Sequence, residues 1–513
     1  MKKIKLITVI AVTLALVAIP LFCAYAQSGP KPKYGGVLKI IGRRSTTVLG
    51  APYERGLSYP TAAPPVMENL IRMGWKGEAL FVLATSFDVK PKEKQIIMGL
   101  RKGIKFHDGS DFNAEAVKVN LETKGPRGVQ IRSIKSVDVI DEYTARLNLS
   151  EFSTSIFSYM GLGSGMMASA KAIKIPATPE TRAKLHMVGS GPFTFVDWQR
   201  DEFIKYKKFD GYWQKGKPYL DGLEILYISD PVTALAAFQS GQGHVIYEIT
   251  PKDARDLKAK GHKITYTASG YSVLVGDGLN PDSPFAKKGV REAVEYAIDK
   301  KAIAEGLGFG YWEPVTQPCP TGHKMGYVPG LKVRSYDPEK AKQLLKDAGY
   351  PNGFQSKIIA LTTHNRDALV AIQNFLAAVG IQVKLDLVDR AKYYATVREG
   401  WQNSMVFGGA SAVPDMAGDF ERWYSGKGAF GYNKMLRPAG FDALIAEMLS
   451  TYEPAKHREL VQKGVKWMHE DAFVTPLWTS PALAASHKSV KGLQWYENAL
   501  SQHWTPADAW FDR

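Results

Sequence analysis

The clearest hydrophobic pattern lies in residues 336–353, which read YDPEKAKQLLKDAGYPNG. Apolar side chains recur there every three or four residues, the spacing that places them on one face of an α-helix. Asp337 precedes Pro338 as a helix N-cap would, and Gly349 follows the last apolar position. The pattern predicts a helix with a buried stripe formed by Ala341, Leu344, Leu345 and Ala348.

Helices and strands alternate along much of the chain. Asp230 and Pro231 open a second predicted helix, which Gly241 ends. A third helical stripe is followed by Gly380 and by residues 381–388, IQVKLDLV, where apolar and polar positions alternate as in a half-buried strand. Helix, tight turn and strand in this order indicate an α/β fold. The third stripe consists of Leu369, Ile372, Leu376 and Val379, and further strands are predicted at residues 35–41, 144–149 and 223–228.

The first 26 residues resemble a secretory signal peptide rather than part of a folded domain. Three lysines precede an apolar run over residues 6–19, and small residues favour cleavage after Ala26. The run is shorter than the roughly 20 residues that a retained membrane span needs. Cys23 raises the alternative of a lipid anchor, but the bulky Phe22 before it disfavours lipoprotein processing. We therefore expect a periplasmic or otherwise extracytoplasmic protein.

Length and composition indicate a globular protein with more than one packed unit. The chain has 513 residues, of which 45% are hydrophobic and 23% charged. Cleavage after Ala26 leaves Cys319 as the only cysteine, so an intramolecular disulfide is excluded and core burial must stabilise the fold. A lone thiol between Pro318 and Pro320 is more often a small buried apolar group than a nucleophile.

The formal net charge of +16 raises the question of an anionic partner. The densest basic stretches, KYKKFDGYWQKGK and KDARDLKAKGHK, are interrupted by acids or aromatic residues, and no run of five basic residues occurs. Basic residues spread in this way are typical of a solvated surface. We therefore expect no nucleic-acid partner.

Residues 103–112, GIKFHDGSDF, place His107 beside Asp108 and close to Asp111. These side chains would have to converge to bind a metal or form a catalytic dyad, whereas neighbours in an extended segment point to opposite faces. Asp108 and Gly109 suit a tight turn, and Asn113 can cap a helix at AEAVKVNLE. The stretch therefore favours a structural turn over a metal site or a hydrolase dyad.

Other motifs for catalysis or cofactor binding are missing from the sequence. There is no HExxH pair and no GxSxG nucleophile elbow, and after cleavage at Ala26 no second cysteine remains to share a zinc ion with Cys319. The glycine-rich stretches at Gly161 and Gly306 do not continue as a phosphate-binding GxxxxGK motif. We expect no cofactor and no metal.

Several stretches of the sequence resemble one protein family. LRKGIKFHDGSDFNAEAVK is similar to the signature of the extracytoplasmic solute-binding proteins of family 5, which serve ABC importers of dipeptides, oligopeptides and nickel. The first strand of that family is similar to KYGGVLKI in this chain. The middle of the family resembles three stretches, VDVIDEYTARLNL, VGSGPFTFVDW and DGYWQKGKPYLDGLEI. The start of its second lobe resembles GVREAVEYAIDKKAI and YDPEKAKQLLKDAGYPNGF. The resemblance extends from Tyr34 to about Val490.

The resemblance implies an architecture that composition alone does not give. It implies a two-lobed periplasmic-binding-protein-like fold of the class II type, with a hinge and an inserted subdomain. The crossings near Asn280 and Val490 would be the hinge. The first lobe would contain residues 34–55, 188–279 and 490–513, the inserted subdomain residues 56–187, and the second lobe residues 280–489.

The same resemblance implies a receptor and not an enzyme. A solute that contacts both lobes favours the closed form by its differential affinity for that form. The permease subunits of the ABC transporter would recognise the closed receptor, and we expect the receptor to be a monomer. The alternative from another class is a secreted hydrolase that uses His107 with Asp108 or Asp111.

The expected ligand is less defined, because the chain departs from the family pattern. Peptide binders of the family have an aspartate within a segment like ADYxxP, where it pairs with the peptide ammonium. Ser411 takes that place here, and Asp415 follows four residues later. Without the carboxylate a buried ammonium would lack its partner, so the ligand is either peptide-like or another amphipathic or anionic compound. Ala116 and His244 also replace acids that the family usually has.

Candidate ligand-binding residues come from both lobes. In the first lobe, the GRRSTTVLG segment after the first strand offers arginines suited to an anionic group. In the second lobe, aromatic residues around Ser411 offer flat apolar walls, although each of them is also a candidate core residue. The predicted set consists of Arg43, Arg44, Thr46, Trp401, Phe407, Ser411, Asp415 and Trp423.

Overall fold

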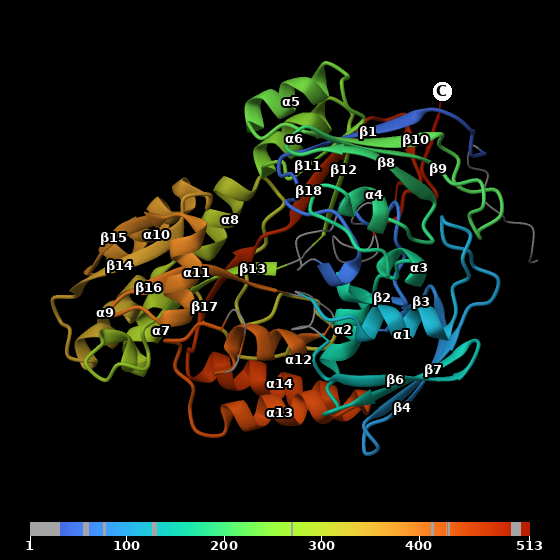
Figure 1. The fold of residues 1–513 in the computed structure, drawn as a ribbon. Helices are drawn as coiled ribbons and strands as arrows, with labels where there is room; N and C mark the ends of the chain where they lie inside the picture. Colours follow the sequence, from blue (N-terminus) through green and yellow to red (C-terminus); the bar gives the residue numbers. More distant parts are fainter. Residues whose placement is uncertain are drawn as a thin grey trace, which may run out of the picture.

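The computed structural model describes residues 31–54, 61–74, 78–125, 131–267, 270–411, 415–426, 428, 431–493 and 504–512. The predicted cleavage site at Ala26 and the predicted lipidation candidate Cys23 lie outside these residues. Figure 1 shows two separate sheets that form the two halves of the molecule, and a third, smaller sheet below the first. None of the helices in the described part of the chain combines the length and apolar character that crossing a bilayer requires.

The first half, which we call the first lobe, is built on a seven-stranded sheet with the strand order β12-β18-β11-β1-β10-β9-β8. β1 pairs in parallel with both β10 and β11, and the remaining pairs are antiparallel. The strands are β1 (Val37–Gly42), β8 (Phe193–Gln199), β9 (Phe203–Lys208), β10 (Gly222–Tyr227), β11 (Val245–Tyr247), β12 (Lys263–Thr267) and β18 (Ala482–Ser486). The helices α5 (Pro231–Gln239) and α6 (Pro251–Ala259) belong to the same half.

The second half, the second lobe, is built on a five-stranded sheet with the order β15-β14-β16-β13-β17. β14 is parallel to both β15 and β16, while β13 pairs antiparallel with β16 and β17. The strands are β13 (Gly270–Gly276), β14 (Phe354–Leu361), β15 (Ile381–Val388), β16 (Met405–Ser411) and β17 (Thr475–Thr479). The helices are α7 (Lys288–Ala297), α8 (Lys300–Gly308), α9 (Pro338–Asp347), α10 (Arg366–Ala377), α11 (Arg390–Glu399), α12 (Met416–Asp419), α13 (Phe441–Ser450) and α14 (Pro454–Glu470).

A smaller unit, which we call the insert, contains the described residues between 61 and 187. Its main sheet has four antiparallel strands in the order β4-β5-β7-β6, and β2 and β3 form a separate hairpin. The strands are β2 (Ile71–Met73), β3 (Ala79–Phe81), β4 (Ala84–Lys90), β5 (Gln95–Leu100), β6 (Ile134–Asp141) and β7 (Thr144–Leu149). The helices are α1 (Ala114–Glu122), α2 (Ser155–Gly161), α3 (Ala170–Ile173) and α4 (Arg182–His186).

Side-chain caps explain where the predicted helices begin. The Asp337 side chain accepts a hydrogen bond from the Lys340 amide at the start of α9, and Asp230 does the same for Thr233 at the start of α5. The apolar stripe of α10 is buried, and Gly380 follows it with φ at 95°, a left-handed conformation that glycine adopts without strain. The predicted helix, turn and strand of this region are confirmed, with the strand at β15.

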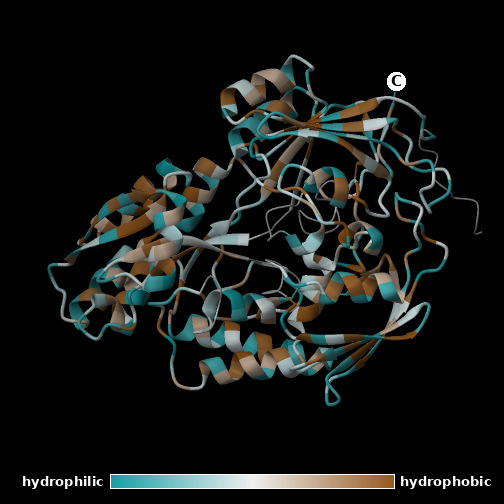
Figure 2. Ribbon diagram, in the orientation of Figure 1, coloured by the Kyte–Doolittle hydropathy of each residue, from teal (hydrophilic) through white to brown (hydrophobic). Residues whose placement is uncertain are grey.

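Separate hydrophobic cores lie beside the sheets, and Figure 2 shows hydrophobic residues on both strands and helices. Cys319 packs into the core of the second lobe, where it is 1% exposed. Burial there raises the pKa of its thiol, so the thiolate is disfavoured. The expectation of a buried, unreactive thiol agrees with this environment.

The chain passes between the two lobes at two neighbouring places. β12 leads to β13 through residues 268–269, which lie outside the described residues, and β17 leads to β18 through Ser480 and Pro481. The Ser480 amide donates to the Gly270 carbonyl at 3.0 Å, and the hydroxyls of Ser272 and Ser480 are 2.9 Å apart. The strands on either side of the crossings thus pair antiparallel, β12 with β18 and β13 with β17, and Ser480 is hydrogen-bonded to the start of β13.

These crossings lie some residues before the predicted ones near Asn280 and Val490. Sheet membership puts β13 in the second lobe and β18 in the first, whereas the predicted boundaries would place each in the other lobe. The reason is that residues 270–276 and 482–486 continue directly from the crossings as strands, and the glycine- and proline-rich stretch around Asn280 follows β13. The exact limits of the lobes remain a prediction.

A buried hydrogen-bonded cluster attaches the insert to the first lobe. The Glu68 carboxylate accepts hydrogen bonds from Ser190 Oγ at 3.0 Å, Tyr212 OH at 2.8 Å and Trp213 Nε1 at 2.8 Å. Glu68 is 5% exposed, and burial raises the pKa of its carboxyl group. Because the donors follow the insert in sequence and belong to the first lobe, the two units are expected to move together.

Candidate ligand-binding site

The candidate site of the first lobe lies at the carboxyl ends of parallel strands, the usual place for ligands in α/β sheets. Arg43 directly follows β1, and Glu248 directly follows β11, which pairs with β1. Tyr247 OH lies where a side chain at Gly42 would be, so the end of β1 requires glycine. In Figure 1 the blue chain leaves β1 and runs into the space between the two halves.

The predicted first-lobe residues differ in what they can offer a ligand. Arg43 is partly buried, and its Nε is buried without a hydrogen-bond partner among the described residues. Arg44 is exposed and forms an ion pair with Glu248, Nε to Oε2 at 3.4 Å. Thr46 is 7% exposed, and its hydroxyl donates to the Val48 carbonyl at 3.0 Å. Of the three, Arg43 is the one with a buried donor that has no partner among the described residues.

Glu248 is a further candidate site residue, which the sequence did not indicate. It adopts a left-handed conformation with φ at 60°, which is uncommon outside glycine and is frequent at functional sites. Its carboxylate forms the ion pair with Arg44, and its backbone follows β11, the strand beside β1. The signal in the sequence is weak: an acid that follows a three-residue apolar strand, VIY.

The second-lobe part of the site begins at the carboxyl end of β16. Ser411 is the last residue of β16 and pairs with Gly270, the first residue of β13 after the crossing. The backbone of Ser411 thus lies at the junction of the two lobes. Asp415 is 8% exposed and caps α12, where its Oδ1 accepts a hydrogen bond from the Gly418 amide at 3.2 Å.

Three aromatic residues were predicted to contact the ligand. Trp401 is 3% exposed and Phe407 is 6% exposed, and both pack in cores of the second lobe. Their burial does not support direct ligand contact, because the core takes up the surface that a ligand would need. Trp423 is partly buried and stacks on Tyr432, with ring centroids 6.0 Å apart, so it retains a partly accessible ring.

The segment around His107 is a turn. Gly109 has φ at 81°, its amide donates to the Phe106 carbonyl at 2.9 Å, and Asp111 pairs with Lys105 at 2.6 Å. Asp108 accepts hydrogen bonds from the hydroxyls of Ser110 and Ser169. Asn113 caps α1 through the Ala116 amide at 3.0 Å, so alanine at position 116 leaves this bond intact. The side chains serve the fold, as predicted.

His107 itself fills a structural position between the insert and the first lobe. Its Nε2 lies 2.8 Å from the Gly191 carbonyl, the Gly189 amide points to Nδ1 at 3.4 Å, and its ring packs edge-on against Phe209. These partners fit a neutral imidazole with the proton on Nε2. Burial lowers the pKa of His107 to about 4.

We expect His107→Ala to lower the melting temperature while leaving ligand affinity within a few-fold of the wild type. The substitution removes the two hydrogen bonds and the Phe209 contact, and such losses typically cost about 1–3 kcal/mol. Differential scanning fluorimetry and calorimetric titration measure the two quantities. A loss of turnover on some substrate with unchanged melting temperature would instead support the hydrolase.

The contacts of His244 indicate that this side chain stabilises the fold. Its Nδ1 accepts a hydrogen bond from the Lys39 amide at 3.0 Å, and its ring packs edge-on against Phe511 at 4.7 Å between centroids. The ring thereby connects β1 to the C-terminal segment. A carboxylate could accept the same amide hydrogen bond but would lack the aromatic contact.

Comparison with known proteins decides the family. The family model described as bacterial extracellular solute-binding proteins, family 5 Middle, matches residues 81–431. The chain belongs to this family. A curated relative, the glutathione-binding protein GsiB of Shigella flexneri, is 28% identical over 92% of each chain.

Solved structures agree with this membership. The agropinic acid complex of AgaA from A. tumefaciens R10 matches with a TM-score of 0.74 and 28% identity, covering 93% of this chain and 99% of that one. The peptide complex of DppA from Helicobacter pylori matches with a TM-score of 0.76 and 23% identity, covering 94% and 99%. The two-lobed periplasmic-binding-protein fold of family 5 is confirmed.

Family 5 proteins are the solute-binding receptors of ABC importers. This chain therefore binds a small molecule or peptide and delivers it to permease subunits, and it is not an enzyme. The receptor prediction is confirmed over the hydrolase alternative. Extracytoplasmic localisation follows from the family.

Proposed function

We propose that this family 5 receptor binds a small solute that carries a carboxylate, and that Arg43 is its principal anion contact. The observation that carries the proposal is the buried Arg43 Nε without a hydrogen-bond partner among the described residues. A buried donor without a partner costs free energy, and a ligand oxygen would remove that cost.

The charges around Arg43 support an external anion as its partner. Hydrogen bonds from Thr233 lower the pKa of the Asp230 carboxyl group, and the nearby charge of Arg43 makes a smaller contribution in the same direction. These hydrogen bonds cap α5, and the Asp230 carboxylate accepts them from the amide of Thr233 at 2.8 Å and from its hydroxyl at 2.7 Å. Glu248 pairs with Arg44. Arginine binds a carboxylate through two parallel N–H donors, which gives both affinity and orientation.

Position 411 supports the same ligand class from the other lobe. Serine at this position has no charge to pair with the ammonium of a peptide, so an ammonium there would be buried at a cost. The relatives at 28% identity bind glutathione and agropinic acid. Both compounds carry carboxyl groups, while glutathione also carries an ammonium group. The feature that they share, a carboxylate, is the one that we propose to bind to the first lobe.

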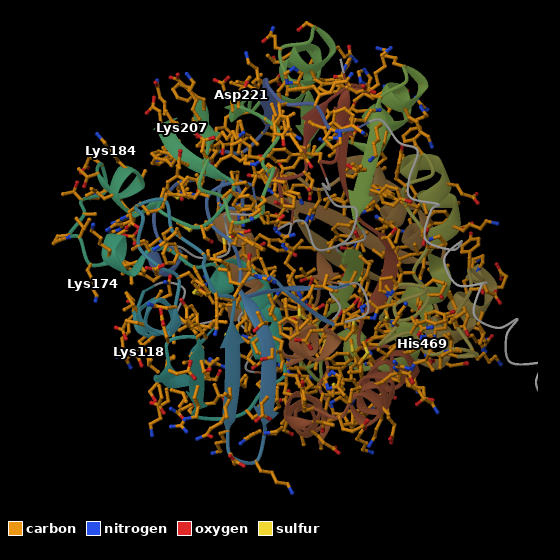
Figure 3. The ribbon with its side chains drawn as sticks, turned by 90° about the vertical axis from the view of Figure 1, so that its right-hand side faces the viewer. Lys118, Lys174, Lys184, Lys207, Asp221 and His469 are labelled. Carbon is orange, nitrogen blue, oxygen red and sulfur yellow. The ribbon has the colours of Figure 1, made fainter. Side chains whose placement is uncertain are left out.

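Transport follows from closure about the two crossings. A solute held by Arg43 on one side and by the segment after β16 on the other stabilises the closed form relative to the open one. We further propose that the receptor acts as a monomer, binds no nucleic acid and is released by cleavage after Ala26. Lysines such as Lys174, Lys184 and Lys207 are spread along the outer edge of the molecule in Figure 3 and do not form one compact patch.

We expect Arg43→Gln to weaken ligand binding roughly 10- to 100-fold, because a hydrogen bond to a charged group contributes about 1.5–3 kcal/mol. Native mass spectrometry of protein purified from its own host identifies a retained solute, and a thermal-shift screen that includes glutathione provides others. Calorimetric titration then gives the affinity.

Arg200→Gln is the matched control, because Arg200 also lies in the first lobe but its side chain is 61% exposed and, among the described residues, forms an ion pair with the neighbouring Asp201. Its affinity should equal that of the wild type. Equal affinity of the Arg43→Gln variant, or a retained solute without any acidic group, would overturn the proposal.

A further inference from the structure

A cavity of about 510 Å³ lies where the insert meets the second lobe. Its walls come from both units, so that neither unit forms the cavity alone. Its lining includes aromatic and thioether side chains: Phe81, Phe87 and Phe157 from the insert, and Met325 and Tyr452 from the second lobe. Phe81 and Tyr452 are 42% and 46% exposed, which places them at its rim.

Direct contacts join the insert and the second lobe around this cavity. The Thr154 amide donates to the Leu449 carbonyl at 2.8 Å. The Tyr452 ring packs against Phe152 and Phe157, with centroids 6.0 Å and 5.8 Å apart. The insert is attached to the first lobe through the Glu68 cluster, so this contact surface is expected to change when the lobes move relative to each other.

Two buried acceptors in the cavity wall have unused hydrogen-bonding capacity. Asp415 is 8% exposed, and its Oδ2 has no hydrogen-bond partner among the described residues. Thr154 is 9% exposed, and its Oγ1 is likewise without a partner in the described part of the chain. Both residues line the cavity, one from each unit. A buried carboxylate oxygen without a donor is costly, and a ligand donor would remove this cost.

The remaining polar lining fits a donor better than an acceptor. His457 Nδ1 lies 3.0 Å from the carbonyl oxygens of Met448 and Thr451, so this nitrogen carries a proton. Glu78 adds a second acid. Arg458 is the one cation among the described lining residues, and it is exposed, where water and salt screen its charge. Arg422, outside this lining, interacts electrostatically with Asp415 but leaves its Oδ2 without a hydrogen bond.

We propose that this junction cavity is a second binding site, specific for small organic ammonium ions with an aromatic or branched apolar group. The ammonium donates to Asp415 and Thr154, and the apolar group lies against the aromatic and methionine side chains, which also attract cations. The proposal does not depend on the carboxylate site at Arg43. Because the ligand contacts both units, it favours the arrangement in which they touch.

Benzylammonium is a suitable probe, with benzyl alcohol and benzoate as neutral and anionic analogues of similar shape. We expect saturable binding of benzylammonium to the full chain by calorimetry or ligand-observed NMR, and at least tenfold weaker binding of both analogues. Equal binding of the three compounds, or no saturable binding of benzylammonium, would overturn the proposal.

Variants locate the bound amine. Asp415→Asn keeps an N-cap residue for α12 but removes the charge, and it should weaken benzylammonium binding at least tenfold. Phe81→Ala changes an exposed position of a surface hairpin and should weaken it several-fold even if Asp415→Asn does not fold. Tyr336→Ala, at a similarly exposed tyrosine outside the cavity, is the control and should have no effect. Unchanged affinity in Phe81→Ala would overturn the assignment.

Two further measurements separate this site from the transport site. Arg43→Gln should bind benzylammonium as the wild type does, and loss of binding in this variant would place the amine between the lobes and overturn the proposal. Small-angle scattering should show a smaller radius of gyration at saturating benzylammonium. An unchanged radius with intact binding would overturn the coupling to closure. Neither result bears on whether a carboxylate binds at Arg43.

Discussion

Glu295→Gln is expected to lower the free energy of unfolding by about 3–5 kcal/mol, the typical cost of breaking a buried ion pair. Glu295 on α7 is 1% exposed and pairs with Lys300 at 2.9 Å and Arg334 at 3.2 Å. Both cations are themselves buried, at 6% and 8% exposed. The neutral glutamine amide would remove one carboxylate from Lys300 and Arg334, and water solvates these two buried charges poorly.

Urea unfolding followed by circular dichroism at 222 nm would measure this loss. Glu305→Gln is a matched control, because Glu305 makes the same type of pair with Lys301 at 3.8 Å, but both side chains are exposed. An exposed pair contributes about 0–1 kcal/mol. Similar losses in the two variants would show that burial of Glu295 does not determine its contribution.

Acidification from pH 6.5 to pH 5 is expected to destabilise the protein through two partly buried histidines, His107 and His364. Burial lowers the pKa values of His107 and His364 to about 4 each, below the value of 6.5 that unfolded histidine has. The unfolded state therefore binds more protons in this range, and stability falls as the pH falls towards 4. Each histidine accounts for up to about 3 kcal/mol once the pH is below its folded pKa.

The double variant His107→Gln/His364→Gln tests this assignment. Glutamine cannot gain a proton here, so the midpoint of urea unfolding should vary less between pH 6.5 and 5 than in the wild type. The window avoids most carboxylates, which titrate at lower pH. An equally steep dependence in the double variant would mean that other groups cause the acid sensitivity.

Structural features that depend on a few neighbouring residues could be predicted from the sequence. Asp230, Asp337 and Asn113 were each expected as helix caps, and each side chain accepts the hydrogen bond from the third residue after it. A cap depends on one side chain and the backbone of one helical turn, so the sequence within a few positions determines it. The alternation of strands and helices predicted the α/β class for the same reason.

The crossings between the lobes were less predictable. The stretch DGLNPDSP around Asn280 has the composition of a linker, but it follows β13 within the second lobe. The real crossing joins two strands, and the ladder between β13 and β17 continues to Ser480. Such pairing is set by residues some two hundred positions apart along the chain, which local composition cannot report.

The candidate site likewise contains residues that the sequence could indicate and residues that it could not. Arg43 could be proposed because it follows a recognisable strand, and the end of a parallel strand is a general ligand position. Trp401 and Phe407 were proposed from residue type, and an aromatic residue in sequence has no mark that separates a cavity wall from a core. Glu248 was missed because its contact with Arg44 depends on β1 and β11 being neighbours.

The burial of Cys319 has a practical consequence for following the motion of this receptor. Its thiol is shielded by the second-lobe core and protonated at neutral pH, so maleimide reagents should leave it unmodified in the folded protein. Two cysteines introduced on the surface, one in each lobe, would then accept a donor and an acceptor fluorophore while the native thiol stays in place. Energy transfer between the dyes would report opening and closing of single molecules in real time.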